Sequence, residues 1–403
     1  IGYVLHAVIR RHYDRNKSLT VHCLYLLFFW LFFCFAQFTG PAFDNTVAFE
    51  DAFDRVIFAP ATLTAGLEYQ ANSMHDVMVG YGRDMTQDVK IGGGFVQNEW
   101  QMKYFTLLAG FRLDKHNLID KPIFSPRINL LYRPFEKLQA RLTWSTGFRA
   151  PQAYDEDLHV TAVGGEGVLI TLADGLREER SNSYSGSVDY TTTFGHWAAN
   201  VLVEGFYTGL DHVFVLEDMG HNAEGYAIKE RRNGSGARVY GANLDAKLAH
   251  GKEAVFSLGF TAQRSRYTAP EVWSEDKDGN PLTTSRMMRT PDYYGYFTFT
   301  SEPVKNFDFS LSGTYTGSMI VPHYAGFIEE DRMEVTPDFF DLNVKFNYTF
   351  VLHDHIKLQV NTGVQNILGH FQPDLDRGEY RDSGYFYGPT QPRTVFVGFK
   401  ILN

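Results

Sequence analysis

The sequence predicts an all-β protein, a transmembrane antiparallel β-barrel. Three observations support this fold class: about 14 segments alternate apolar and polar residues with a period of two, the connections between them alternate between long and short, and a short apolar leader near the N-terminus is typical of export. The 403 residues include 34 Phe, 23 Tyr and 36 Gly, and only 21% are charged. This composition favours strands over long amphipathic helices.

The clearest predicted strand covers residues 340–350, where apolar and polar residues alternate at every position. One face carries Phe340, Leu342, Val344, Phe346, Tyr348 and Phe350, and the other carries Asp341, Asn343, Lys345, Asn347 and Thr349. Similar segments are centred near residues 66, 95, 109, 129, 142, 185, 202, 242, 259, 295, 311, 345, 361 and 397. Most span about 9 to 13 residues, which exceeds the roughly 5 to 6 of a globular strand and fits the roughly 9 to 11 that cross a bilayer.

The predicted connections between these strands alternate in length. Long connections are expected near residues 367–390, 318–337, 267–287, 211–233, 150–178 and 115–122, and short ones near 352–355, 302–305, 250–252, 194–196 and 135–137. Outer-membrane barrels pair short periplasmic turns with long extracellular loops, whereas a soluble sandwich has no reason to keep this parity. We therefore expect the long connections to face the cell exterior.

A signal-peptide-like leader is predicted over residues 1–36. Four basic residues precede an unbroken apolar run, Cys23–Ala36, whose length matches the apolar region of a signal peptide. Cys34 and Ala36 are small enough for a cleavage before Gln37. The alternative is a single transmembrane helix over residues 19–38, which reaches the minimum of about 20 residues.

The remaining chain divides into an unassigned segment, residues 37–60, and the predicted barrel, residues 61–403. Both cysteines of the protein, Cys23 and Cys34, lie in the leader. The barrel region therefore has no disulfide framework and no thiolate metal site.

Charge and motif content exclude several function classes. The chain has 37 Lys and Arg against 47 Asp and Glu, a net charge of −10, which argues against a nucleic-acid partner. No nucleophile elbow, zinc-protease motif or phosphate-binding loop occurs. The His353-Asp354-His355 run could suggest metal ligands, but a solvated turn is favoured because the predicted hairpin there is minimal. The sequence predicts no enzyme, no resident cofactor and no metal site.

Several motifs, taken in order, resemble the barrel of TonB-dependent outer-membrane receptors. Ser125-Pro126-Arg127 opens a strand, and Gly147-Phe148-Arg149-Ala150-Pro151 closes the next one. Further similar segments are Leu67–Gln70, Phe95–Trp100, Glu179–Ser183, Arg232–Gly236, Val364–Leu368 and the final strand, Thr394–Leu402. The likeness covers roughly residues 60–403. Many outer-membrane proteins end on an aromatic residue, whereas this chain ends on Asn403.

The resemblance implies a barrel of about 22 strands in the Gram-negative outer membrane. Such receptors import a scarce nutrient of the iron-siderophore, haem or cobalamin class. In that family the TonB complex transmits energy from the inner membrane by pulling on a plug domain after the loops have bound the nutrient. The implied partners are outer-membrane lipid, the TonB complex where a plug is supplied, and a small-molecule nutrient such as an iron chelate.

The sequence departs from the family pattern in its N-terminal part. Neither a plug nor a TonB-binding box is recognisable, and the predicted strands number about 14. Three explanations are open: a fragment of a larger receptor, a gene remnant with an altered leader, and a barrel closed with 14 strands. A fragment or a remnant is favoured, and the expected function is a receptor barrel that is incomplete without its plug. A plug-free passive diffusion porin is the alternative.

Candidate substrate-binding residues lie in three of the long predicted loops. They are Arg149, Tyr154, His323, Tyr324, Arg381, Tyr385 and Tyr387. The imidazole and carboxylate groups near His323 have the chemistry to contact an iron chelate, and the tyrosines of the last loop are rigid amphipathic side chains that can hold a ligand. A solvated loop and an aromatic girdle are the alternative interpretations at these positions.

Overall fold

The computed structural model describes residues 45–56, 59–78, 83–151, 168–221, 223, 227–353, 356–382, 384–389 and 391–402. The chain divides into two compact units, residues 1–43 and 44–403, and all described strands belong to the second unit. The predicted leader and its alternative, a helix over residues 19–38, lie outside the described residues. Among those that are described, no helix has the length and apolar character needed to span a membrane.

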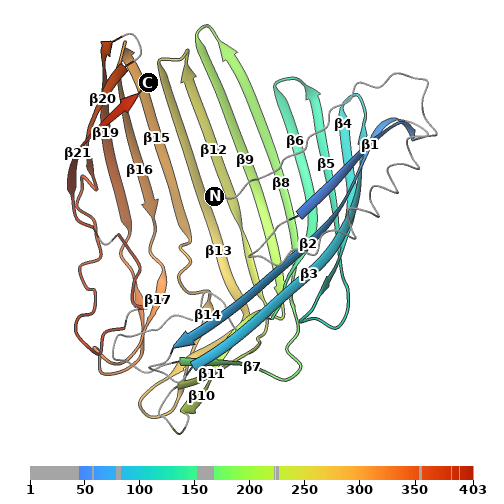
Figure 1. Cartoon of the computed structure of the whole chain (residues 1–403), viewed down its shortest axis with the longest axis vertical. Helices are drawn as coiled ribbons and strands as arrows, with labels where there is room; N and C mark the ends of the chain where they lie inside the picture. Colours follow the sequence, from blue (N-terminus) through green and yellow to red (C-terminus); the bar gives the residue numbers. More distant parts are fainter. Residues whose placement is uncertain are drawn as a thin grey trace. The chain divides into compact units, whose positions relative to one another are not determined.

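One large antiparallel sheet dominates the second unit (Figure 1). In spatial order its main path contains β1 (Asn45–Val56), β2 (Ala59–Met78), β3 (Arg83–Gln101), β4 (Phe105–His116), β5 (Ile123–Phe135), β6 (Leu138–Arg149), β8 (Glu179–Phe194), β9 (Trp197–Asp211), β12 (Ala237–His250), β13 (Ala254–Glu275), β15 (Tyr293–Val304), β16 (Phe307–Thr316), β19 (Phe339–His353), β20 (Ile356–Gln365) and β21 (Thr394–Leu402). Each strand pairs with its neighbour along the chain or across a long loop, which is an up-and-down arrangement.

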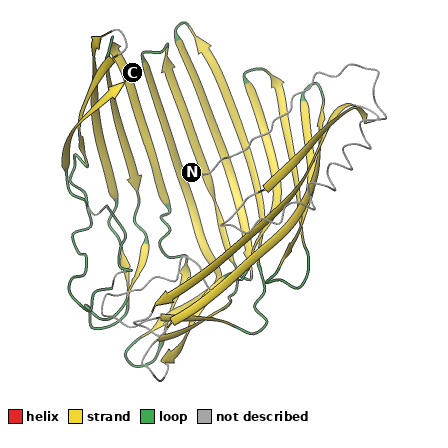
Figure 2. Cartoon of the chain, viewed as in Figure 1, coloured by secondary structure: helices red, strands yellow, loops and turns green. Residues whose placement is uncertain are grey.

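Smaller elements lie inside the long loops. β14 (Pro281–Arg286) pairs with β13, a three-stranded sheet contains β7 (Val168–Leu172), β10 (Phe214–His221) and β11 (Ala227–Asn233), and a hairpin contains β17 (Ile320–His323) and β18 (Arg332–Val335). Figure 2 shows strands as the regular structure of the described chain, with irregular segments as the connections. The long loops are therefore folded units of their own.

All 14 predicted strand centres fall inside strands of the large sheet, and the alternation of long and short connections is confirmed. Two differences stand out. β1 is a further strand, in the segment that the sequence left unassigned. β13 runs to Glu275, beyond the point where residue 267 was expected to begin a loop, because it pairs with β14 and the two satisfy each other's backbone groups.

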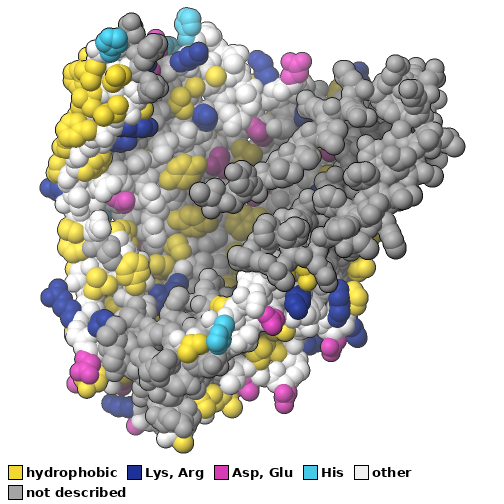
Figure 3. All heavy atoms as spheres, in the orientation of Figure 1, with side chains coloured by type: hydrophobic (Ala, Val, Ile, Leu, Met, Phe, Trp, Pro, Cys, Tyr) yellow, Lys and Arg dark blue, Asp and Glu magenta, His cyan; other side chains and the backbone are white. Residues whose placement is uncertain are grey.

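The strands are amphipathic, with an apolar and a polar face. On the apolar face the ring of Phe297 covers Gly313 and reaches Phe340 two strands away, with ring centroids 6.3 Å apart. Exposed apolar side chains continue to β21, where Val395, Val397, Phe399 and Ile401 are 62% to 77% exposed. Figure 3 shows hydrophobic side chains gathered over this part of the sheet. Such a surface needs an apolar environment, as lipid provides.

The polar face carries hydrogen bonds and ion pairs between neighbouring strands. Arg112 forms ion pairs of 2.7 Å with both Glu68 and Asp114. Farther along, the amide of Asn243 donates to Glu204 at 3.2 Å and accepts from the hydroxyl of Thr261 at 2.9 Å. Along the middle of the strands, the faces therefore have the division that the sequence pattern predicted.

β1 and β21 are the two edges of the large sheet. They do not pair with each other in the described residues, so the sheet does not close there into a barrel of 14 strands. The edge strand β21 exposes its outer backbone groups, which is the arrangement of a partial barrel wall.

Candidate functional site

Two long loops at the C-terminal end of the sheet pack against each other. The connection from β16 to β19 contains the β17–β18 hairpin, and the connection from β20 to β21 covers residues 366–393. A buried apolar cluster joins them and consists of Met319, Val321, Phe339, Tyr385 and Tyr387. We name these two connections, docked on this cluster, the loop pair.

Arg289, from the connection that precedes β15, links the loop pair to a third loop. Its backbone N–H donates to the carbonyl of Ile320 at 2.8 Å, and its guanidinium donates to the carbonyls of Phe386 at 3.0 Å and Gly384. One residue therefore holds both members of the loop pair, the hairpin through its backbone and the last loop through its side chain.

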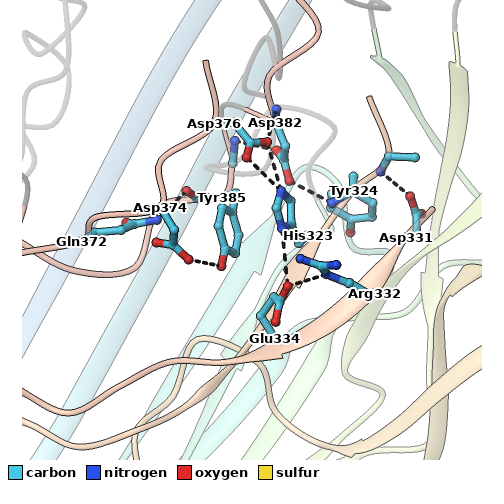
Figure 4. A network of polar contacts seen from close by, with 12 residues as sticks. His323, Tyr324, Asp331, Arg332, Glu334, Gln372, Asp374, Asp376, Asp382 and Tyr385 are labelled. Atoms are coloured by element: carbon cyan, nitrogen blue, oxygen red, sulfur yellow. Dashed lines mark hydrogen bonds and ion pairs between the residues drawn. The ribbon is translucent and has the colours of Figure 1, made fainter. Parts of the chain in front are cut away.

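His323, at the end of β17, occupies the centre of the loop pair (Figure 4). Only 3% of the residue is exposed, and Nε2 lies 3.0 and 3.1 Å from the two carboxylate oxygens of Asp376. On its other side, Nδ1 lies 3.8 Å from Oε1 of Glu334 and has no hydrogen-bond partner. The imidazole therefore bridges the hairpin and the last loop between two carboxylates.

Tyr385 and Tyr387 share one acceptor inside the loop pair. Their hydroxyls donate to the two carboxylate oxygens of Asp374, at 2.8 and 2.5 Å. Burial and these hydrogen bonds to an anion raise the pKa of both phenols above the ordinary value. Burial opposes the charge on Asp374, but the hydrogen bonds that the carboxylate accepts, led by those from Tyr387 and Tyr385, together outweigh burial and lower the pKa of this carboxyl. The cluster is therefore built around an ionised carboxylate and two neutral phenols.

Polar side chains also fix the backbone of the last loop. Gln372 is 2% exposed, donates to the carbonyl of Tyr385 at 3.1 Å and accepts from the N–H of Tyr387 at 2.9 Å. Asp382 accepts from the N–H of Tyr324 at 3.0 Å, across the loop pair. These bonds give buried backbone groups of an irregular loop the partners that a strand would otherwise supply.

The structure brings together four of the seven predicted site residues, namely His323, Tyr324, Tyr385 and Tyr387. Tyr324 contacts a further element, since its ring lies 5.9 Å from the ring of Trp273 on β13. The two buried tyrosines, 4% and 9% exposed, hold the loops together and have little surface for a ligand. Their neighbours Tyr380 and Phe386, 66% and 52% exposed, are more exposed than Phe371 of the same loop, which is 39% exposed.

The other three predicted residues are not shown to contact His323 or the two buried tyrosines. Arg149, at the end of β6, forms an ion pair of 2.7 Å with Glu179, and its guanidinium lies over the ring of Phe214. In the strand order of the sheet, β6 is several strands away from the strands that carry the loop pair. The guanidinium of Arg381 donates to the carbonyl of Gly378 in its own loop. Tyr154 lies outside the described residues.

Sequence reasoning missed four acidic residues and one amide of the loop pair. These are Glu334, Asp374, Asp376, Asp382 and Gln372. A signal was present in the last loop, since carboxylates at every second position, 374 and 376, lie between aromatic segments. In the described residues no three histidine, cysteine, aspartate or glutamate side chains are grouped to hold a metal ion.

A cavity of about 580 Å³ lies on the polar face, where β16, β19 and β20 meet the end of the last loop. Its polar lining includes Ser310, Asp341, Asn343, Lys345 and Gln365. Hydroxyl, amide, carboxylate and ammonium groups thus face one space under the loop pair. The arrangement can hold a polar molecule by several hydrogen bonds but contains no paired nucleophile and base.

Comparison with protein families gives one match, to the family described as TonB dependent receptor-like, beta-barrel, over residues 16–367. The chain belongs to this family. The match covers most of the sequence and confirms the likeness that the strand motifs indicated. It also does not favour the diffusion-porin alternative, because the family is one of transport receptors of the outer membrane.

Solved receptor structures have the same fold as this receptor barrel. The ferric enterobactin receptor of Pseudomonas aeruginosa matches with a TM-score of 0.61 and 17% identity, over 89% of this chain and 53% of that one. The siderophore receptor PirA of Pseudomonas aeruginosa matches with a TM-score of 0.61 and 15% identity, over 90% and 56%. The FrpB iron transporter of Neisseria meningitidis matches with a TM-score of 0.59 and 16% identity, over 88% and 54%.

This receptor barrel therefore spans about half the length of the solved structures it matches. Comparison with curated proteins gives no match. At 15% to 17% identity, the structural likeness establishes the fold of this chain. It does not show what this chain binds.

Proposed function

We propose that this chain forms the barrel wall and ligand-binding loops of an outer-membrane receptor for an iron-siderophore complex. The proposal includes export by the predicted leader and insertion of the apolar face into the outer membrane. Coupled import requires the TonB complex together with a plug, and we propose that these residues bind the nutrient but do not import it unaided.

The observation that carries the proposal is the docked loop pair. Two loops on either side of the β19–β20 hairpin are held by one buried cluster, and the last loop presents Tyr380 and Phe386 at the surface. Rigid aromatic side chains on a fixed support bind a flat, partly aromatic ligand with little loss of conformational entropy. Iron-siderophore complexes have this chemistry, and the receptors with the same fold include ferric enterobactin and siderophore receptors.

A binding and uptake experiment tests this function. Cells that display these residues in the outer membrane are expected to bind a radiolabelled ferric siderophore at the surface and to accumulate none inside. Internal label that disappears when TonB is deleted would contradict the proposed dependence on a plug. Surface binding no greater than that of cells without the protein would contradict the receptor function itself.

Paired variants of the last loop locate the ligand. Replacing both Tyr380 and Phe386 by Ala is expected to weaken ferric siderophore binding by about tenfold or more, because exposed aromatic anchors contribute most of the affinity at such surfaces. The control is Phe371→Ala, which removes an aromatic side chain of the same loop that is 39% exposed. Equal effects of the two changes would place the ligand elsewhere.

A further inference from the structure

Four arginines lie together where β12, β13 and β14 pair side by side. The register places Arg238 of β12 opposite Arg266 of β13, and Arg266 opposite Arg286 of β14. Arg264 precedes Arg266 by two residues and therefore shares its face. Like charges directly opposite each other destabilise a sheet, so this arrangement calls for a compensating group.

The arginines lie on the apolar face of the sheet. Arg264 is opposite Tyr240, and four residues earlier on the same face Phe260 is opposite Leu244. Both Phe260 and Leu244 are exposed on this face, as are the residues of the apolar belt around them. The cluster is thus the continuation, on the same face, of the surface that we propose to contact lipid.

The position of the cluster along β13 matches the edge of the lipid. Ten residues separate Ala254, where β13 leaves a short turn, from Arg264. At about 3.3 Å per residue and a strand tilt of about 40°, this is a height of about 25 Å, the height of the apolar band of an outer-membrane barrel. The arginines therefore lie at the outer boundary of the bilayer, on the side of the long loops.

The counter-charges within the structure are few. Asp292 lies 2.6 Å from Arg264, 3.7 Å from Arg286 and 3.8 Å from Arg266, so one carboxylate faces three guanidinium groups. Arg238 forms no ion pair in the part of the chain that the structure describes. Its cross-strand partner on β9 is Gly209, and the nearest carboxylate on that strand, Asp211, lies diagonally beyond it.

Aromatic side chains of the interface surround the arginines. The guanidinium carbon of Arg264 lies 5.5 Å from the ring centre of Tyr293, and Tyr207 stacks on Tyr240 with ring centroids 6.5 Å apart. All three tyrosines are 40% to 46% exposed. Amphipathic rings gather at the level of lipid headgroups, so they mark the same boundary as the height calculation.

We propose that this arginine cluster, Arg238, Arg264, Arg266 and Arg286, binds the phosphate groups of a phosphorylated lipid in the outer leaflet. The guanidinium groups bind the phosphate oxygens in pairs, and the acyl chains lie on the apolar belt below, beside Phe260. The proposal rests on the membrane placement given under "Proposed function", but it requires neither a nutrient nor TonB.

The test measures lipid binding to the full chain folded in detergent micelles. Native mass spectrometry compares a lipid with two phosphate groups on its headgroup, the same lipid after dephosphorylation, and inorganic phosphate. The bisphosphorylated lipid is expected to bind at least about tenfold more tightly than the dephosphorylated form, because charge-assisted bonds to phosphate are lost with the phosphates. Inorganic phosphate is expected not to displace the lipid at equal concentration.

Matched arginine variants locate the lipid. Replacing Arg238 and Arg286 by Gln is expected to remove most of this preference, whereas replacing Arg133 and Arg141, on the polar face, by Gln is expected to change affinity less than twofold. Both variants lose two positive charges, so the comparison excludes a general effect of net charge. If the first variant does not fold, Arg238→Gln compared with Arg141→Gln gives the same comparison with one charge removed from each, since the exposed side chain of Arg238 forms no ion pair in the described structure.

Three results would overturn the proposal: equal binding of the phosphorylated and dephosphorylated lipids, equal loss in the two variants, and displacement by inorganic phosphate, which would assign the cluster to a free anion. Ferric siderophore binding measured on the same preparation separates the two proposals. Loss of siderophore binding with lipid binding intact contradicts only the proposed function, and the reverse result contradicts only the lipid site.

Discussion

The imidazole ring of His323 lies face to face on the phenol ring of Tyr385, with ring centroids 3.6 Å apart and an angle of 4° between the planes. One ring belongs to the β17–β18 hairpin and the other to the loop between β20 and β21. His323 therefore joins the two loops in two ways, through this stack and through its contact with Asp376. The rim of the receptor barrel is therefore a packed structure in which movement of one loop must disturb the other.

Replacing His323 by Ala is expected to loosen the loop pair without unfolding the sheet. Asp376 would lose a buried donor while its side chain stays 1% exposed, and an interaction of this kind contributes about 1.5 to 3 kcal/mol. Hydrogen exchange at the amides of Gln372 and Tyr387, which are bonded within the loop pair, should accelerate by about ten- to hundredfold.

The control for this experiment is His196→Ala, in the short turn between β8 and β9. The exposed ring of His196 contacts His250 and none of the loop pair, so exchange at Gln372 and Tyr387 should be unchanged. Unchanged exchange in the His323 variant as well would mean that the apolar cluster and the bonds of Arg289 and Asp382 hold the loops without the imidazole.

Gly326, in the turn of the hairpin, lies close to the last loop. A Cβ on this residue would lie 2.5 Å from the carbonyl oxygen of Tyr380, and its φ of +142° is unfavourable for other residues. Gly326→Ala is therefore expected to cost about 1 to 3 kcal/mol of loop docking, from backbone strain and the clash together. Limited proteolysis should cleave the last loop faster in this variant.

Gly378→Ala is the matched control for that change. Gly378 lies in the last loop with a φ of +90°, but its added Cβ would meet nothing within 4 Å. It carries the backbone strain without the clash between loops. Cleavage as fast as in the Gly326 variant would show that strain, and not the contact with Tyr380, controls docking.

The two buried tyrosines predict a pH range in which the loop pair is stable. Their pKa values are raised from the ordinary 10.0, so the stability they contribute is complete below pH 10 and is lost as the pH rises further. The pKa of Asp374 is lowered from 3.8, so its contribution is present above that pH and is lost in more acidic solution. The loop pair should be most stable between these limits.

An alkaline titration of tyrosinate absorbance checks the upper limit. The wild-type protein is expected to show a late ionisation step that coincides with faster proteolysis of the last loop. The variant with both Tyr385 and Tyr387 replaced by Phe should lack the contribution of these residues to that step. A difference between the two proteins that appears near pH 10, the ordinary pKa of tyrosine, and not at higher pH would contradict the prediction, because the two phenols would then ionise like exposed ones.

The strands of the sheet could be predicted because their signal is local. A period of two over ten or more residues, as in 340–350, can be seen in the sequence without knowledge of the partner strand. β1 was missed because Asp51 interrupts the apolar row of Val47, Phe49 and Phe53. β17 and β18 contain four residues each, which is too short for periodicity to separate a strand from a loop.

The loop pair could be predicted only in part. His323 and Tyr385 were identified by their chemistry, but their contact joins positions 62 residues apart and depends on how two irregular loops dock. Whether an aromatic residue of a loop is buried, as Tyr385 is, or exposed, as Tyr380 is, follows from that docking. The composition of the loops and the spacing of their residues carry no information on how the two loops dock.

The two faces of the sheet should respond in opposite ways to the same charged residue. Phe346, near the middle of β19, lies on the apolar face and contacts the rings of Phe307 and Phe309. Phe346→Arg is expected to cost about 2 to 4 kcal/mol in a bilayer, the cost of an arginine on the lipid side at mid-depth. Thr298→Arg on the polar face, whose cross-strand neighbours Ser257 and Ser312 are uncharged, should cost less than about 1 kcal/mol.

Urea unfolding of both variants in lipid vesicles measures this difference. The Phe346→Arg variant should unfold at a lower urea concentration than the wild type, and the Thr298→Arg variant at nearly the same concentration as the wild type. In detergent-free buffer the comparison has no meaning, because both faces would then contact water. Equal destabilisation in vesicles would show that the face of Phe346 is not in contact with lipid, and the membrane placement of the whole sheet would then be wrong.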